Sequence, residues 1–143
     1  MFVNTILDQK GRDVITVTPS ASIREAVKLL AARRIGAVLV REDGAANAAG
    51  ILSERDIVRG LAEKGPALLE RPVSEMMTRD LFTCAPADSI DQVMDVMTKR
   101  RIRHLPVTDR GRLIGMISIG DVVKFRMAEI EREAEDLRQY IAS

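Results

Sequence analysis

The order of apolar and polar positions occurs twice along this chain. The stretch that begins at Val14 aligns without a gap with the stretch that begins at Leu81, so equivalent residues lie 67 positions apart (81 − 14). The match continues to Gly44 and its equivalent, Gly111. The first half then has two extra residues, and the alignment resumes with equivalents 65 positions apart. A repeat of this kind predicts two copies of one structural unit.

Each copy predicts the order strand, helix, strand, turn, strand, helix. Ser22-x-x-Glu25 in the first copy and Ser89-x-x-Gln92 in the second have the pattern of a capping box, which predicts the start of a helix. Apolar residues at helical spacing follow each of them. Short apolar runs with β-branched residues favour buried strands, and they occur at 15–17, 37–40, 50–52, 82–85, 105–107 and 113–117. Second helices are expected at 56–62 and from Asp121 onward.

The tail is predicted as a long C-terminal helix, 127–143. Apolar residues recur from Val123 to Ile141 at alternating spacings of four and three, which is an a/d seam of about two and a half heptads. Such a helix either packs back on its own unit or pairs with its copy in a homodimer, and we favour the homodimer. The remaining divisions are an N-terminal segment at 1–13, the two units at 14–65 and 81–126, and a linker at 66–80.

Composition narrows the classes of function. The 22 basic and 21 acidic residues give a net charge of +1, which disfavours general nucleic-acid binding. Aromatic residues are only 3%, too few for a base-stacking surface. The one cysteine, Cys84, forbids an internal disulfide and is interpreted as a small buried residue of a cytoplasmic protein. We expect no membrane span, no metal site and no enzymatic activity.

Two segments place a Ser-x-x-Asp motif at the start of a helix. Ser53 with Asp56, and Ser118 with Asp121, have the spacing of a further capping box. The alternative is a binding role, because a helix N-terminus attracts anions and a carboxylate has two oxygens for the hydroxyls of a ribose. Lys10 and Arg12 precede the first strand, where they either reach a phosphate tail or lie in a solvated turn.

The two copies resemble CBS domains in the tandem arrangement called a Bateman module. The residues that carry the resemblance are the repeat itself, the run Arg103-His104-Leu105-Pro106-Val107, the Gly-x-x-Ser-x-x-Asp segments and the run 73–78. The resemblance covers about 14–126. It implies an α/β (α+β) fold in which each copy is a small three-stranded sheet packed against two helices, with the copies related by a pseudo-two-fold axis.

The resemblance also implies two ligand clefts, each formed by both copies. Carried over by position, the main cleft contains Ser53, Arg55, Asp56, Thr83, Ile102, Arg103, His104 and Pro106. The second cleft contains Thr16, Ile35, Gly36, Ala37, Ser118 and Asp121. Because Gly36 and Ala37 stand where the other copy has Arg103 and His104, only the main cleft has basic side chains for a phosphate. We therefore expect the nucleotide in the main cleft.

The function implied is a non-catalytic sensor of an adenosine-containing ligand. AMP, ADP or ATP is expected, and NAD or S-adenosylmethionine is the less common alternative. Binding would change the shape or association of a homodimer and signal to an unknown regulated protein. The alternative hypothesis is a structural or adaptor protein that keeps the fold and binds no nucleotide.

Overall fold

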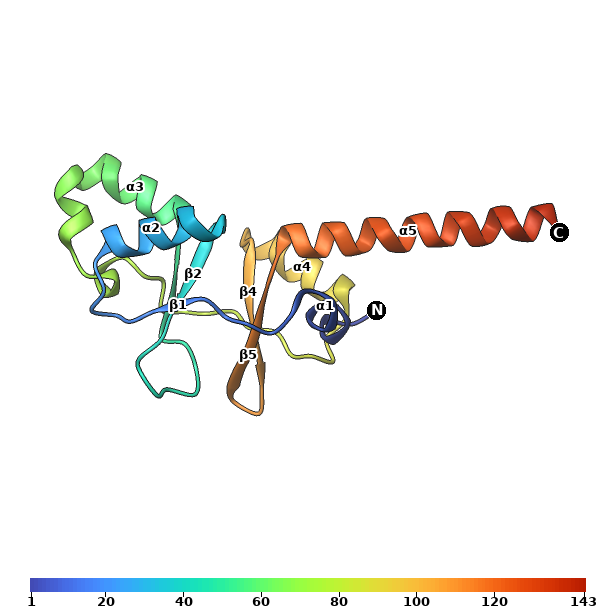
Figure 1. Cartoon of the computed structure of the whole chain (residues 1–143), viewed down its shortest axis with the longest axis horizontal. Coiled ribbons are helices and arrows are strands. Elements are labelled where there is room, and N and C mark those ends of the chain that lie inside the picture. The colour runs from blue at the N-terminus through green and yellow to red at the C-terminus, as the bar shows by residue number, and fades with distance from the viewer. The chain divides into compact units, whose positions relative to one another are not determined.

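Each copy of the repeat folds as the apolar pattern predicts, into strands that alternate with helices (Figure 1). The computed structural model describes all residues, Met1–Ser143. The elements are α1 (Val3–Lys10), β1 (Thr16–Val17), α2 (Ile23–Arg33), β2 (Ala37–Val40), β3 (Gly50–Ser53), α3 (Glu54–Lys64), α4 (Ile90–Arg100), β4 (His104–Asp109), β5 (Arg112–Ser118) and α5 (Ile119–Ala142). Two short 3-10 helices, Pro66–Glu70 and Val73–Glu75, lie between α3 and α4. This confirms the expected α/β fold class and its long C-terminal helix.

The sheets of the two copies differ by one strand. In the first copy, β1 pairs in parallel with β2, and β2 pairs in antiparallel with β3. In the second copy, β4 and β5 form a two-stranded sheet, and the expected strand at 82–85 is reduced to a single parallel bridge between Cys84 and Val107. Pro106 explains the loss. Its equivalent, Leu39, donates its N–H to the carbonyl of Ile15 at 3.4 Å, whereas proline has no N–H to donate.

The first compact unit contains Asp13–Phe82 together with Thr108–Ile114. Its core is a cluster of aliphatic side chains from α2, β2, β3 and α3. The segment expected to be a linker takes part in this core, because Leu68 and Val73 are fully or almost fully buried there. Gly60 on α3 leaves the space that this packing requires, since a Cβ at that position would lie 2.7 Å from Leu68.

The second compact unit contains Met1–Arg12, Thr83–Val107 and Gly115–Ser143. Helix α1 was not predicted from the sequence pattern, and it belongs to this unit although it precedes the first copy in the sequence. Val3, Ile6 and Leu7 of α1 are buried, and Leu7 packs so closely on β5 that a Cβ at Gly115 would lie 2.8 Å from its Cδ2. The N-terminal helix is therefore part of the core of the second copy.

Serine caps begin the first helix of each copy, as predicted. Ser89 and Gln92 form the complete capping box of α4. Ser22 caps α2 by accepting the Glu25 N–H at 3.1 Å, but the reciprocal bond from the Glu25 side chain is absent. The backbone on either side of Ser22 is paired instead with Arg71 and Val73.

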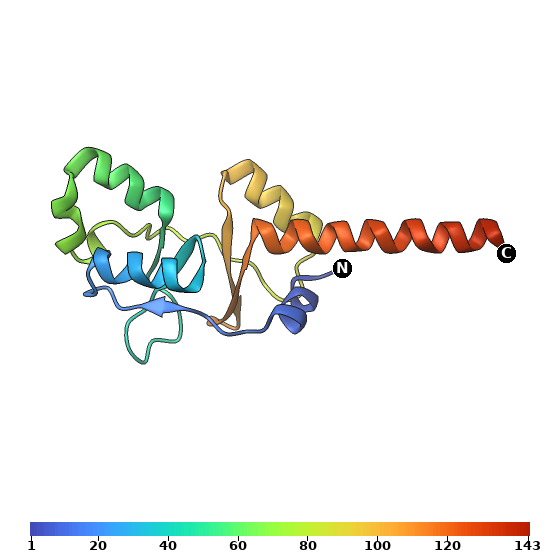
Figure 2. The same ribbon diagram turned by 45° about the horizontal axis from the view of Figure 1, so that its top comes forward.

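Helix α5 is the longest element, with 24 residues. Its N-terminal half packs on α4 and α1, and its C-terminal half extends beyond both of them, which the two ribbon views show alike (Figure 2). Almost every residue of that C-terminal half is exposed. None of the helices of this protein combines the length and the apolar character that crossing a bilayer requires.

Cys84 is a buried thiol in the core of the second unit. Its side chain is 6% exposed, and its nearest polar partner is the carbonyl of Pro106 at 3.8 Å. Burial raises the pKa of Cys84 to about 12, and the negative charge of Asp88 adds to the rise. The thiolate is the nucleophilic form, so this cysteine is suited to packing rather than to chemistry.

We predict that Cys84 of the folded protein reacts with iodoacetamide at pH 8 at least about 100-fold more slowly than a free thiol of pKa near 8.5, because so little thiolate forms. Mass spectrometry of timed samples measures the rate. The control is the same protein in guanidinium chloride, where the rate of an ordinary cysteine should return. A native rate close to that of the unfolded chain would contradict the burial of this thiol.

Candidate functional site

Both Ser-x-x-Asp motifs lie where a strand runs directly into a helix. At the start of α3, the Asp56 N–H donates to Ser53 Oγ at 3.2 Å, and the Ser53 N–H donates to Asp56 Oδ2 at 3.0 Å. The same two bonds measure 3.2 and 2.9 Å between Ser118 and Asp121 at the start of α5. The predicted capping boxes are therefore present in both copies. The bonds use Oδ2 alone, so Oδ1 of each aspartate has no partner within the chain.

A backbone hydrogen bond joins each capped helix to the residue that precedes the neighbouring strand. The Glu54 N–H donates to the carbonyl of Gly36 at 2.9 Å, and in the other copy the Ile119 N–H donates to the carbonyl of Arg103 at 2.8 Å. This bond holds the carboxylate of each copy beside the loop that enters β2 or β4. The helix N-terminus adds its partial positive charge to the same place.

The predicted site residues divide between the two compact units. Those of the first unit are Thr16, Ile35, Gly36, Ala37, Ser53, Arg55 and Asp56, and those of the second are Thr83, Ile102, Arg103, His104, Pro106, Ser118 and Asp121. Each unit thus brings together half of each predicted cleft around one strand–helix junction. The assignment of these halves to a main and a second cleft stays a prediction.

Solvent exposure differs among the residues expected to bind a ligand. Ala37 and Pro106 are buried in their strands, where they contribute backbone and packing rather than a polar side chain. His104 is half-buried at the start of β4. Arg55 and Arg103 are exposed, and neither of them is in an ion pair of the chain. Both guanidinium groups are therefore available to an anion.

Lys10 distinguishes the two aspartates. Its ammonium group lies 2.6 Å from Asp121 Oδ2 and also donates to the carbonyl of Met116 at 2.9 Å. Asp56 has no such cation. This contact could not be predicted from the sequence, because the two residues are 111 positions apart and no local pattern connects them. Arg12 is likewise engaged, by Asp8 and Asn4, so neither basic residue lies in an unpaired, solvated turn.

The ion pair changes the acidity of Asp121. Partial burial acts to raise the pKa of this carboxyl, but it is outweighed by the hydrogen bond from Lys10, the bonds from Ser118 and the positive charge of Lys10. The net result is a pKa below the ordinary value, so Asp121 is ionised and paired at neutral pH. Asp121 therefore already has a positively charged partner from its own chain.

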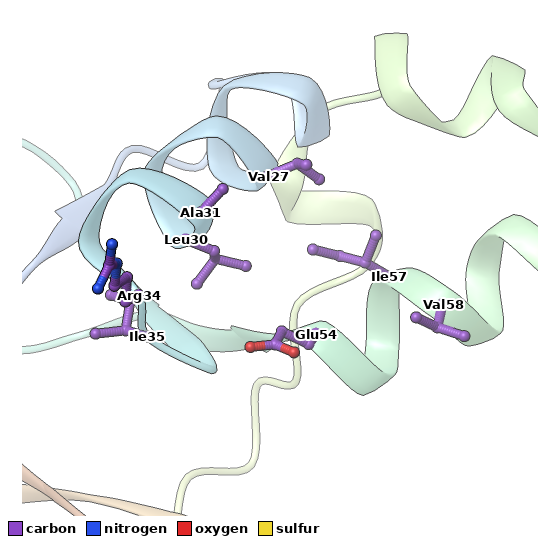
Figure 3. Close-up of a pocket in the computed structure, with 8 residues that line it drawn as sticks. All are labelled: Val27, Leu30, Ala31, Arg34, Ile35, Glu54, Ile57 and Val58. Carbon is purple, nitrogen blue, oxygen red and sulfur yellow. The ribbon is translucent and has the colours of Figure 1, made fainter.

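A separate hollow of about 540 Å³ lies between α2 and α3 in the first unit (Figure 3). Its lining is mainly aliphatic, with Arg34 and Glu54 as the only charged side chains, and it comprises Val27, Leu30, Ala31, Arg34, Ile35, Glu54, Ile57 and Val58. Only Ile35 belongs to a predicted cleft. The hollow therefore offers mainly apolar packing area, with the Arg34 guanidinium group as its only cationic donor.

Comparison with known proteins identifies the repeat. The family model of the CBS domain matches residues 10–63 and 73–128. The CBS domain-containing protein YhcV of Bacillus subtilis is 31% identical, over 88% of this chain and 88% of its own. The crystal structure of the CBS-domain protein ATU1752 from Agrobacterium tumefaciens is 48% identical, with a TM-score of 0.85 over 88% of this chain and 99% of that one.

Two solved structures similar to this chain contain adenosine-based ligands. The CBS domain protein PAE2072 from Pyrobaculum aerophilum, complexed with AMP, is 27% identical, with a TM-score of 0.75 over 85% of this chain and 89% of its own. The CBS domain pair of MJ0100, complexed with 5′-methylthioadenosine and S-adenosyl-L-methionine, is 26% identical, with a TM-score of 0.79 over 90% and 98%. The repeat, the paired strand–helix junctions and these matches together show that this chain belongs to the CBS domain family and contains two CBS domains in tandem.

Proposed function

We propose that this protein is a regulatory CBS pair that binds an adenine nucleotide, with AMP, ADP or ATP as the expected ligand and NAD or S-adenosylmethionine as alternatives. Binding changes the shape or the association of the pair and so signals to a regulated protein. The module itself catalyses no reaction. Support comes from the two similar structures that contain AMP or S-adenosylmethionine with 5′-methylthioadenosine.

The observation that carries this proposal is the Asp56 carboxylate at the start of α3. It is held by the Ser53 cap through Oδ2, keeps Oδ1 without a partner and is in no ion pair. A ribose presents two neighbouring hydroxyls, and a fixed carboxylate accepts hydrogen bonds from both. The geometry that caps the helix thus also prepares a sugar-binding acid.

The asymmetry between the copies supports the main cleft as the nucleotide site. Arg103 is exposed, is in no ion pair and stands where the first copy has Gly36. In the second cleft, Asp121 Oδ2 already accepts from Lys10, so a ribose there would share the carboxylate with that ammonium group. The proposed nucleotide therefore has its ribose on Asp56 and its phosphate on Arg103, with His104 as a further donor.

Three further parts of the proposal concern the oligomeric state, the location and the partners of the protein. We infer a homodimer, because Val58 on α3 is 66% exposed beside the apolar hollow and Val123, its equivalent on α5, is 44% exposed. A cytoplasmic location suits a protein whose only cysteine is a buried thiol. The near balance of charge argues against nucleic acid as the partner.

A thermal-shift assay tests the proposed function. A ligand at about 100 times its dissociation constant adds roughly 2.7 kcal/mol to the free energy of unfolding, so the correct ligand raises the melting temperature by several degrees. AMP, ADP, ATP, NAD and S-adenosylmethionine are compared, with GMP as the control for the base. If none of them raised the melting temperature, the protein would be the structural or adaptor CBS pair instead.

The same substitution at equivalent positions tests which carboxylate binds the ribose. We expect Asp56→Asn to weaken nucleotide binding by about 10-fold or more, since it removes the charge from one charge-assisted acceptor. Asp121→Asn is the matched control, because it makes the identical change in the other capping box, and affinity should stay within about twofold. Isothermal calorimetry gives both values. If Asp121→Asn weakened nucleotide binding and Asp56→Asn did not, the ribose would bind at Asp121 instead.

The phosphate partner is tested at Arg103. Removal of a charge-assisted bond worth about 1.5–3 kcal/mol predicts that Arg103→Ala weakens AMP binding roughly 10- to 150-fold. Adenosine has no phosphate, so its affinity should change little. Arg112→Ala removes an exposed arginine outside the predicted clefts and serves as the control. Equal AMP affinity of wild type and Arg103→Ala would refute this role for Arg103.

A further inference from the structure

Helix α5 carries a continuous row of exposed apolar side chains. Five of its members are between 44% and 74% exposed. The row consists of Val123, Met127, Ile130, Ala134, Leu137 and Ile141, which is the a/d seam seen in the sequence. Large apolar side chains gathered on one stripe of a surface indicate a contact with another molecule.

The seam is not the face by which α5 packs on its own unit. That face contains Val122, which is fully buried, and Glu129, whose side chain is only 14% exposed. At 3.6 residues per turn the seam lies roughly 100° around the helix axis from it. The seam therefore stays accessible while α5 is packed on α4 and α1, and its C-terminal part lies on the extended half of the helix (Figures 1 and 2).

The charges beside the seam show which arrangement of two helices it fits. With Met127 and Ala134 at position a, Arg126 and Glu133 occupy position g, and Glu131 and Arg138 occupy position e. In a parallel coiled coil in register, each g residue faces the e residue five positions later on the other helix. Arg126 then faces Glu131, and Glu133 faces Arg138. Both pairs are of opposite charge.

The antiparallel arrangement brings like charges together. There g faces g and e faces e, so full overlap of the seam places Glu133 against Glu133 and Glu131 against Glu131 of the other copy, and Lys124 against Arg138. Sliding one helix by a heptad restores opposite charges, but it leaves two of the six seam residues at one end without a partner. Only the parallel, in-register arrangement gives all six seam residues a partner and also places opposite charges beside the seam.

Intrachain contacts leave these charges available. Glu131 and Glu133 are in no ion pair of their own chain. Arg126 bonds to Glu129 at 2.8 Å, yet its side chain is 44% exposed, and a guanidinium group has five donors. Arg138 contacts Glu135 at 3.3 Å, with 76% of its side chain exposed.

We infer that α5 pairs with α5 of a second copy of this chain as a short, parallel, in-register coiled coil over residues 123–141. The inference deepens the homodimer of the proposed function. A seam of about two and a half heptads is too short to be stable alone, so it acts together with the other contacts of the dimer. Parallel helices place both CBS pairs at the same end of the coiled coil.

Charge reversal tests the register in the full chain without nucleotide. Glu133→Arg faces Arg138 of the other copy, and Arg138→Glu faces Glu133, so each single change should raise the dimer dissociation constant on the order of 10-fold, since the two-fold axis doubles every pair. The double variant should restore dimerisation. Asp136→Arg, away from the seam, is the charge-matched control. Sedimentation equilibrium measures all four variants.

The outcomes separate the two directions. In the antiparallel arrangement the glutamate of Arg138→Glu would face Lys124 of the other copy, and the dimer would become stronger. In the double variant the arginines at position 133 of the two copies would still repel each other. Either result overturns the proposal, as does a monomeric wild type or a dimer unaffected by Leu137→Glu. Calorimetry with AMP on the same variants keeps this test distinct from the proposed function, because a failed coiled coil with normal nucleotide affinity removes only the dimer geometry.

A single added cysteine gives an independent measurement. Leu137→Cys places two thiols side by side in a parallel dimer, and mild oxidation should link the copies, as seen by non-reducing electrophoresis. Cys84 stays buried and does not interfere. In an antiparallel dimer residue 137 faces residue 127 instead. A covalent dimer that forms only when Leu137→Cys is mixed with Met127→Cys would therefore refute the parallel register.

Discussion

The organisation of this protein depends on a backbone hydrogen bond at each strand–helix junction. The first N–H of α3 or α5 donates to the carbonyl of Gly36 or Arg103, just before the neighbouring strand. An aspartate three residues after the capping serine is thereby held beside the loop that enters β2 or β4. Because the bond involves only backbone groups, both copies keep this geometry although their side chains at 36 and 103 differ.

The duplication produces two equivalent carboxylates, and the N-terminal helix then makes them different. Lys10, at the end of α1, pairs with Asp121 and leaves Asp56 without a cation. The position of α1 is set by buried Leu7 against Gly115, so the pairing depends on apolar packing rather than on charge alone. In the proposed main cleft, exposed Arg103 adds a phosphate partner for which the first copy has only Gly36. Both features support the proposal that Asp56 is the acid that binds the ribose.

The long last helix extends the second CBS domain with a surface that the domain itself does not use. Its buried face and its exposed seam are separate stripes, so the seam that we propose for pairing with a second copy is not used by the core of its own domain. The first N–H of this helix, that of Ile119, donates to the carbonyl of Arg103, which is the proposed phosphate partner. Ligand binding at Arg103 would therefore act on the start of the helix that carries the seam. The proposed coiled coil therefore offers a physical route from the nucleotide to the association of the copies.

Repetition and local spacing were enough to predict the order of strands and helices in each copy, the helix starts at Ser53, Ser89 and Ser118, and the long last helix, because caps and apolar periodicity act over a few residues. The missing strand at 82–85 was also within reach, since Pro106 stands where Leu39 donates a ladder bond.

The tertiary structure alone decided the membership of α1 in the second unit, the burial of Leu68 in the first core and the pairing of Lys10 with Asp121. These contacts join residues far apart in the chain, and no local spacing encodes them, because they form only when separate apolar surfaces pack together.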